Sequence, residues 1–366
     1  MRRSLLLILF TGLTLVTSGA VSLRKPQAVK YYIDSAAGND ACDGKSKKQA
    51  WKSLSRVENL SLSAGDKILL RRGSVFHEMF VIDGALGSKE KPVLVSTYGK
   101  GGKPRIIAPD GSQQAVRILN CSFITVEDLD LSNLGTDSEM RDRIGVNVHL
   151  QDYGEAFDTV LKGLDIHDVN GRLWKGEGAG VAIRFTMNKD SVCNWWNVIR
   201  YNYSHDNDGG FLLICDDGSA RKTFSAGNGG TRIYDNILCR GKRPEPVPDQ
   251  DIRFLSSDNW GGFAIGVQFR DNLFYSEEKE ARFAPSGKDG VRLTGNWYEG
   301  LSEESVATAC DREARGGNDA FRQLLERTGG TRKALGKGFL REVRTATGTL
   351  TTVDRKKIDR FFGREG

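Results

Sequence analysis

A histidine, an arginine and two adjacent aspartates occur in three short segments that share one pattern. The segments are "GVNVHLQD" (145–152), "GVAIRFTM" (180–187) and "GFLLICDD" (210–217), and they carry His149, Arg184, Asp216 and Asp217. A histidine can accept a proton near neutral pH, and an arginine binds a carboxylate through two parallel hydrogen bonds. Together these residue types suit a site that binds an acidic group and moves a proton.

Apolar residues alternate in these segments and in two more, "AVRILNC" (115–121) and "DIRFLSSD" (251–258). Such alternation predicts strands with one buried face. The segments are 30 to 41 residues apart, which is too far for hairpins, so we expect successive rungs of a parallel solenoid. The expected buried pairs are Val116/Ile118, Val146/Val148, Val181/Ile183, Phe211/Leu213 and Ile252/Phe254.

The opposite face of these rungs would be an outward wall. Because adjacent rungs are about 4.8 Å apart, this alignment places His149 beside Arg184, with Asp216 one rung further along. Asn147 and Arg253 occupy the same outward face, and we expect them to contact a substrate.

Acidic residues also recur where the strands end. In this alignment Asp217 and Asp258 would be about 5 Å apart, near the spacing of a retaining glycosidase pair. Asp216 and Asp217 could instead hold Ca²⁺, which takes several oxygen ligands. A third interpretation is a solvated face with incidental charges.

Two further candidates lie outside the wall. The stretch "SHDNDGG" (204–210) is typical of a turn, but turn chemistry does not explain His205, which stays a candidate for a loop site. Trp260, like Trp195 and Trp196, could offer an aromatic platform for a sugar ring; burial in the core is the alternative.

A second repeat places an asparagine in each of four segments, "VIRYNYS" (198–204), "RIYDNIL" (232–238), "QFRDNLF" (268–274) and "RLTGNWY" (292–298). We predict that Asn202, Asn236, Asn272 and Asn296 stack at a bend of the solenoid and hydrogen-bond to one another.

The ends of a solenoid expose unpaired strand edges and need covering. Trp51, Leu54, Val57 and Leu60 recur every three residues, which predicts a capping helix over 47–60. Residues 318–327 and about 332–344 predict helices in a C-terminal tail.

The N-terminus has the form of a secretory signal peptide, with Arg2 and Arg3 before an apolar run and a small-residue site after it. We expect cleavage after Ala20 and export to the periplasm or the extracellular space, with no membrane span in the mature chain. The expected divisions are 1–20, a β-helix domain over 21–310 with its cap at 31–90, and a tail over 311–366.

The net charge of +6 arises outside the body of the protein. Residues 311–366 carry 14 Lys/Arg and 8 Asp/Glu, while residues 21–310 carry 37 and 39. A body with this balance is not expected to bind nucleic acid. The six cysteines contain no CxxC pair, so we do not expect a zinc site. Their even number in an exported protein permits disulfides, and buried free thiols are the alternative.

The stretch "YYIDSAAGNDACDGKSKKQAWKSLSRVENLSLSAGDKILLRRGSVFHE" resembles the opening of secreted right-handed parallel β-helix proteins of the pectate-lyase superfamily, and "VIRYNYSHDNDGGFLLIC" resembles a late coil of the same proteins. The resemblance covers roughly 31–300 and implies an all-β, right-handed parallel β-helix. This chain looks shortened between the equivalents of "GVAIRF" and "NVIRYN".

We therefore expect a secreted, monomeric, carbohydrate-active protein that cleaves or binds an acidic polysaccharide. In a polysaccharide lyase, Arg184 or His149 would be the base; in a glycoside hydrolase, Asp217 and Asp258 would act. The alternative is a non-catalytic glycan-binding or structural β-helix protein.

Overall fold

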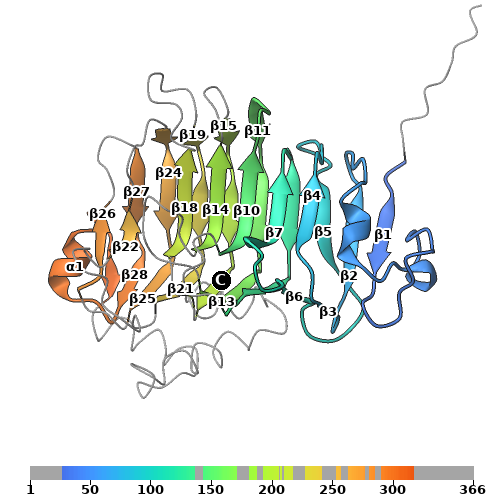
Figure 1. The fold of residues 1–366 in the computed structure, drawn as a ribbon. Helices are drawn as coiled ribbons and strands as arrows, with labels where there is room; N and C mark the ends of the chain where they lie inside the picture. The colour runs from blue at the N-terminus through green and yellow to red at the C-terminus, as the bar shows by residue number, and fades with distance from the viewer. Residues whose placement is uncertain are drawn as a thin grey trace, which may run out of the picture.

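The computed structural model describes only part of the chain. The described residues are 27–136, 143–170, 181–187, 193–205, 207, 210–216, 227–240, 253–256, 263–276, 280–284 and 290–316. They form a solenoid in which every strand pairing between named strands is parallel, so the predicted parallel β-helix architecture is confirmed. Figure 1 shows the coils stacked along a long axis, from β1 at one end to α1 at the other.

Two long sheets run the length of the molecule. Sheet I contains, in spatial order, β1 (Lys30–Ile33), β2 (Lys67–Arg71), β5 (Val93–Tyr98), β8 (Ile124–Glu127), β12 (Thr159–Lys162), β16 (Val198–Arg200), β20 (Arg232–Tyr234), β24 (Val267–Arg270) and β27 (Val291–Thr294). Sheet II contains β3 (Val75–Phe76), β6 (Arg105–Ile107), β9 (Asp130–Asn133), β13 (Asp165–Val169), β17 (Tyr203–His205), β21 (Ile237–Arg240), β25 (Leu273–Ser276), β28 (Trp297–Glu299) and β29 (Arg315–Gly316).

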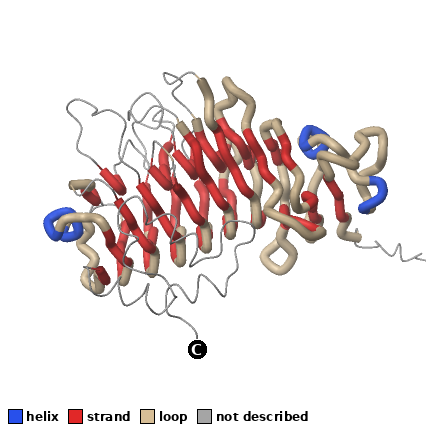
Figure 2. The backbone as a smooth tube through the Cα atoms, turned by 90° about the horizontal axis from the view of Figure 1, so that it is seen from below, coloured by secondary structure: helices blue, strands red, loops and turns tan. Residues whose placement is uncertain are grey.

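The remaining strands form three smaller sheets. Sheet III contains β4 (Phe80–Asp83), β7 (Gln114–Leu119), β10 (Ile144–Leu150), β14 (Val181–Met187) and β18 (Gly210–Asp216). Beyond the ends of its strands lies a four-stranded sheet of β11 (Glu155–Phe157), β15 (Cys193–Trp195), β19 (Gly227–Gly229) and β23 (Phe263–Ile265). The pair β22 (Arg253–Ser256) and β26 (Arg282–Ala284) completes the set. Figure 2 shows the strands side by side across the elongated body.

Each coil visits the sheets in turn. After β7 in sheet III the chain enters β8 in sheet I and β9 in sheet II, and then returns as β10 beside β7. The inward side chains of the coils form one continuous apolar core, in which Val116, Val146 and Ile183 are fully buried. The core therefore holds the rungs of sheet III in a fixed register.

That register differs from the sequence alignment at two rungs. Val146 is opposite Val116 as expected, but it is opposite Ile183 rather than Val181. Side-chain alternation has a period of two, so it cannot distinguish a strand from the same strand shifted by two residues.

The rung of β18 is shifted by one residue. Leu212 is opposite Ile183 and Ile214 is opposite Phe185, whereas the sequence alignment placed Leu213 at the position of Ile183. The run "FLLIC" is apolar at every position, so its sequence carries no alternation that would define the buried face.

The predicted asparagine ladder is confirmed. Nδ2 of Asn202 donates to Oδ1 of Asn236 (3.1 Å), Nδ2 of Asn236 to Oδ1 of Asn272 (2.8 Å), and Nδ2 of Asn272 to Oδ1 of Asn296 (2.9 Å). All four side chains are fully buried. Asp311 ends the ladder, because its Oδ2 accepts from Nδ2 of Asn296 at 2.9 Å.

The N-terminal helix predicted over 47–60 is absent in that form. Two short 3₁₀ helices, η1 (Lys47–Gln49) and η2 (Leu54–Val57), flank an extended segment at Trp51. A three-residue step is the period of a 3₁₀ helix, which explains why the apolar stripe is buried without an α-helix.

At the other end, the α-helix α1 (Glu303–Ala307) begins at Ser302, whose side chain accepts a hydrogen bond from the Ser305 amide. β29 pairs with β28, so the stacked strands continue past residue 310. The helices predicted over 318–327 and 332–344 lie outside the described residues. No helix in the described part of the chain is long and apolar enough to span a membrane.

Candidate functional site

A polar pocket of about 200 Å³ lies on the outer face of sheet III. Side chains from three consecutive rungs line it: Gln113, Gln114, Arg117, Ile144, Asn147, His149, Arg184 and Thr186. Strands β7, β10 and β14 position these residues, since outward side chains stand on the same wall whenever the inward ones pack in the core.

Two columns of side chains cross the three rungs. Arg117, Asn147 and Arg184 occupy one register position. Leu119, His149 and Thr186 occupy the position two residues further along. The expected pairing of His149 with Arg184 is therefore wrong, because Arg184 is directly opposite Asn147; His149 and Arg184 are diagonal neighbours that line the same pocket.

A chain of hydrogen bonds orders the centre of the pocket. Thr186 Oγ1 donates to Asn147 Oδ1 at 3.1 Å, and Asn147 Nδ2 donates to Gln114 Oε1 at 3.0 Å. These bonds fix the orientation of the Asn147 amide across all three strands.

Arg117 contacts the imidazole of the pocket histidine, His149. Nη2 of Arg117 is 3.3 Å from Nδ1 of His149. Since a guanidinium can only donate, this contact requires Nδ1 to accept, so the proton of the neutral imidazole lies on Nε2. The pocket thus combines two permanent cations with an imidazole whose Nδ1 faces the Arg117 guanidinium.

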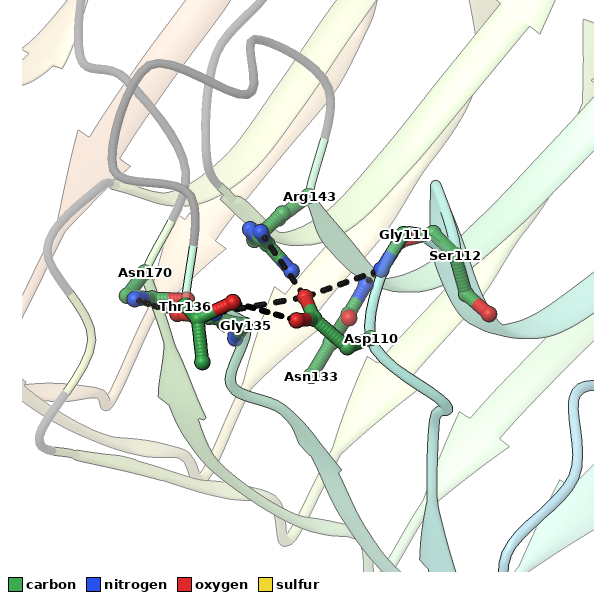
Figure 3. Close-up of polar contacts among 8 residues, drawn as sticks. All are labelled: Asp110, Gly111, Ser112, Asn133, Gly135, Thr136, Arg143 and Asn170. Carbon is green, nitrogen blue, oxygen red and sulfur yellow. Dashed lines mark hydrogen bonds and ion pairs between the residues drawn. The ribbon is translucent and has the colours of Figure 1, made fainter.

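A cluster of polar contacts surrounds the buried Arg143 beside the strands that form the pocket (Figure 3). Arg143, which is completely buried, directs Nη2 toward Oδ1 of Asp110 at 3.4 Å. Nδ2 of Asn133 donates to the carbonyl oxygens of both Ser112 and Ile144, at 3.2 Å each. These bonds tie the segment before β7 to the first residue of β10, so they position Gln113, Gln114 and Ile144 around the pocket.

Glycine makes room for the buried guanidinium. A Cβ on Gly135 would be 1.6 Å from Nη1 of Arg143, so no larger residue fits without displacing the arginine. Asn170 holds this glycine from the next coil, since the Gly135 amide donates to Asn170 Oδ1 (2.9 Å) and Asn170 Nδ2 donates back to the Gly135 carbonyl (2.8 Å).

The structure brings together three of the predicted residues, Arg184, His149 and Asn147. Asp216 is not in their outward columns: it is opposite Met187, whose side chain is buried. The cause is the one-residue shift of β18 described above. Met187 in turn is opposite Leu150 of β10.

The other predicted residues are placed only in part. Arg253 begins β22 and His205 ends β17, opposite His167 of β13. Asp217, Asp258 and Trp260 lie outside the described residues.

Sequence reasoning did not select Arg117, Gln114 and Thr186. Arg117 and Thr186 occupy outward positions of the recognised frame, so the signal was present, but a single polar residue on one rung does not indicate that two others lie beside it. The buried cluster of Arg143 had no periodic signal, because it is built from the turns between strands.

Carboxylates are absent from the eight lining residues. On the described strands of sheet III, Asp83 occupies the outward register of Leu119 and His149, two rungs away from the histidine. Within the described ranges no group of three or more His, Cys, Asp or Glu side chains is arranged to hold a metal ion. Among the cysteines with described side chains, Cys42, Cys121 and Cys310 are free thiols.

Two tryptophans lie where the coil leaves sheet III. Trp195 packs against Gly229 and Trp196 against Gly230, as shown by the 2.1 Å and 2.4 Å distances that a Cβ on each glycine would have to the indole atoms. Trp196 is 54% exposed and its ring centroid is 5.6 Å from that of Phe157. An exposed indole held in this way has the properties of the sugar platform suggested by the sequence.

No protein-family model matches the chain. The lacto-N-biosidase of Bifidobacterium longum subsp. longum is 27% identical over 77% of this chain, and the match spans 19% of that protein. The chain therefore corresponds to about a fifth of the length of this curated relative.

Among solved structures, a GH136 lacto-N-biosidase from Eubacterium ramulus has a TM-score of 0.55 and 18% identity, covering 79% of this chain and 67% of that chain. An alginate lyase from a Paenibacillus species has a TM-score of 0.40 and 14% identity, covering 73% of this chain and 90% of that chain. The first likeness shows that this chain shares the fold of that protein.

Proposed function

We propose that this chain is a carbohydrate-active enzyme that binds a glycan at the pocket of sheet III and cleaves a glycosidic bond there by hydrolysis. The observation that carries the proposal is the polar pocket on three consecutive rungs, in which Arg117, His149 and Arg184 converge. Sequence similarity to a lacto-N-biosidase supports hydrolysis as the reaction.

The lining residues suit sugar recognition. The amides of Gln114 and Asn147 and the hydroxyl of Thr186 can each donate and accept, so they match the mixed hydroxyl groups of a sugar. The two arginines add a preference for substrates with a carboxylate or sulfate.

Hydrolysis needs a pair of carboxylic residues beside the bond that breaks. Asp217 and Asp258 are the pair proposed from the sequence, and Asp83 is a further carboxylate on the same wall. In the hydrolytic reaction one carboxylic acid protonates the leaving oxygen, while the other carboxylate attacks the anomeric carbon or activates water.

A polysaccharide lyase is the second candidate, and one observation favours it: the eight described lining residues include two arginines and a histidine but no carboxylate. Here Arg117 and Arg184 would neutralise the carboxylate of a uronate, and His149 would remove the proton next to that carboxylate. The electrons form a double bond as the glycosidic oxygen leaves. Ca²⁺ at Asp216 and Asp217 remains a proposal that belongs to this candidate.

A glycan screen with the purified protein tests both candidates. Neutral and acidic oligosaccharides and polysaccharides are incubated with the chain, and new reducing ends and ultraviolet absorbance are measured. Hydrolysis gives reducing ends without absorbance, and only the lyase gives an absorbing unsaturated uronate.

Controls separate the candidates. Asp217→Asn and Asp258→Asn should abolish hydrolysis, and a chelator should lower lyase activity if Asp216 and Asp217 hold Ca²⁺. Retention on a glycan without any cleavage would contradict both reactions and indicate a binding module.

Export to the periplasm or the extracellular space is part of the same proposal, because the N-terminal segment has the form of a signal peptide. N-terminal sequencing of protein from the culture fluid and the periplasm should find a chain that starts at Val21. Recovery of uncleaved protein from the cytoplasm alone would contradict it.

A further inference from the structure

The outer face of sheet I carries an uninterrupted row of cations. The consecutive strands β12 (TVLK), β16 (VIR), β20 (RIY), β24 (VQFR) and β27 (VRLT) each contain one basic residue and no acidic residue. We call these five residues the basic strip: Lys162, Arg200, Arg232, Arg270 and Arg292.

The register keeps the strip on one face. Lys162, Arg200 and Arg270 share one column with Tyr234, and Arg232 and Arg292 share the column two residues earlier. The positions between these columns hold core residues such as Ile199 and Ile233. The five cations therefore follow one another at one per rung, over about 19 Å at 4.8 Å per rung.

Contacts around the strip orient the cations, and two of the five also have a carboxylate partner. The ring of Tyr234 is 4.9 Å from the guanidinium of Arg200 and 5.1 Å from that of Arg270, and Nη1 of Arg200 donates to the Tyr234 hydroxyl at 3.1 Å. Lys162 pairs with Glu127 at 2.7 Å, and Arg270 is 3.8 Å from Asp271. Arg232 and Arg292 are exposed and form no ion pair within the described residues.

Such a row is unfavourable for the protein alone, because like charges on adjacent strands destabilise a sheet. The strip does not reflect a general excess of positive charge, since residues 21–310 carry slightly more acidic than basic side chains. A linear polyanion laid across the strands would relieve this repulsion.

We propose that the basic strip is a binding surface for a linear acidic polysaccharide, distinct from the pocket on sheet III. Arginine forks match carboxylate and sulfate groups. One cation per rung suits an extended chain with one acidic group per sugar, which runs across the strands. This binding does not depend on catalysis at the pocket.

Single-stranded nucleic acid is the rival polyanion. Proteins that bind it combine basic grooves with aromatic side chains on which bases stack. The aromatic residue on the basic strip is Tyr234, and its ring is already in contact with Arg200 and Arg270. The strip thus offers charge without a stacking platform, which favours a polysaccharide.

The test is binding of an oligogalacturonate of defined length to the full chain, measured as Kd at several salt concentrations. The variant Arg232→Gln/Arg292→Gln should bind roughly tenfold more weakly than the wild type, with a smaller dependence of log Kd on log salt. Both side chains are exposed and their loss relieves charge repulsion, so the thermal unfolding midpoint should not fall.

Two controls locate the effect. Arg282→Gln/Arg312→Gln removes two exposed arginines elsewhere and should leave Kd unchanged. Arg117→Ala/Arg184→Ala removes the two arginines of the pocket, and in that background Arg232→Gln/Arg292→Gln should weaken binding by the same factor as in the wild type. The proposal is overturned if the strip variant binds like the wild type, if binding is insensitive to salt, or if a single-stranded oligonucleotide binds more tightly than the uronate.

Discussion

At the scale of single residues, the charge of the pocket depends on Arg117 and Arg184. They come from rungs on either side of β10, with Asn147 between them in the same column. Arginine binds a planar anion more specifically than lysine, because its donors form a rigid fork. The pair should therefore determine affinity for the acidic or hydroxyl-rich part of a bound sugar.

We expect Arg117→Ala and Arg184→Ala each to lower kcat/KM by roughly 10- to 100-fold, the value of one or two charge-assisted hydrogen bonds. The measurement is turnover of whichever glycan the screen identifies, with Arg282→Ala as the matched control. If Arg184→Ala keeps full turnover while His205→Ala loses it, the active site lies in the loop around His205 and not on this wall.

His167 provides a pH-dependent contribution to stability. Its Nδ1 is 2.6 Å from Asp168 Oδ2 and its Nε2 is 3.0 Å from Asp130 Oδ1. Burial disfavours the charged imidazolium, but the hydrogen bonds to Asp130 and Asp168 and the charge of Asp165 outweigh it and raise the pKa of His167 to about 9. Both ring nitrogens therefore donate, and the side chain is protonated at neutral pH.

Because the pKa in the folded state exceeds the ordinary value of about 6.5, this contribution is complete below pH 6.5 and is lost as the pH rises through 9. Its upper limit is about 3 kcal/mol. Urea unfolding between pH 6 and 10 should show a steep loss of stability in the wild type and a shallower one in His167→Asn. The exposed His77 supplies the control, since His77→Asn should keep the steep profile.

At the scale of elements, polar side chains at the bends hydrogen-bond each coil to its neighbours. The ladder asparagines donate to carbonyl oxygens of the preceding coil and accept from backbone amides, so each rung is tied to the next. Two aspartates near the N-terminus, Asp40 and Asp66, also bind backbone amides through their side chains. Asp40 accepts from the Lys52 and Ser53 amides, and Asp66 accepts from the Val29 and Ser63 amides.

Asn236→Ala should lower the free energy of unfolding by about 2–4 kcal/mol. The substitution leaves the Asn202 amide and the Ile199 carbonyl without their side-chain partner in a buried site. Chemical denaturation measures the change, and Gln268→Ala on the neighbouring rung, where the side chain is exposed, should stay within about 0.5 kcal/mol of the wild type. An equal effect of both variants would contradict a specific role for the ladder.

At the scale of the whole molecule, the two ends of the core are covered differently. The stacked rings of Tyr31 and Trp51 accompany η1 and η2 at the N-terminal end. At the other end α1, Asp311 and β29 follow the last full coil. Oδ2 of Asp311 also accepts from the Tyr298 hydroxyl at 2.9 Å; burial and this carboxylate raise the pKa of Tyr298.

A chain that ends at Cys310 should therefore be at least 2 kcal/mol less stable than one that ends at Gly316, because it loses Asp311 and the pairing of β29 with β28. Thermal unfolding of the two truncations measures this difference and cancels any effect of residues 317–366. Identical midpoints would show that Asp311 is not needed to end the ladder.

The sequence by itself determined the features that repeat. Parallel rungs, the inward position of Val116 and Val146, and the four stacked asparagines all follow from a period that each coil must satisfy. The register between rungs was decided by tertiary packing, because alternation has a period of two and the run Phe211–Cys215 has no alternation at all. For that reason Asp216 leaves the predicted wall, and Arg117 and Thr186 join His149 and Arg184 in one pocket. The position of the buried Arg143 could not be predicted from the sequence either. Its neighbours Asp110 and Gly135 come together only when separate turns of the solenoid pack against each other.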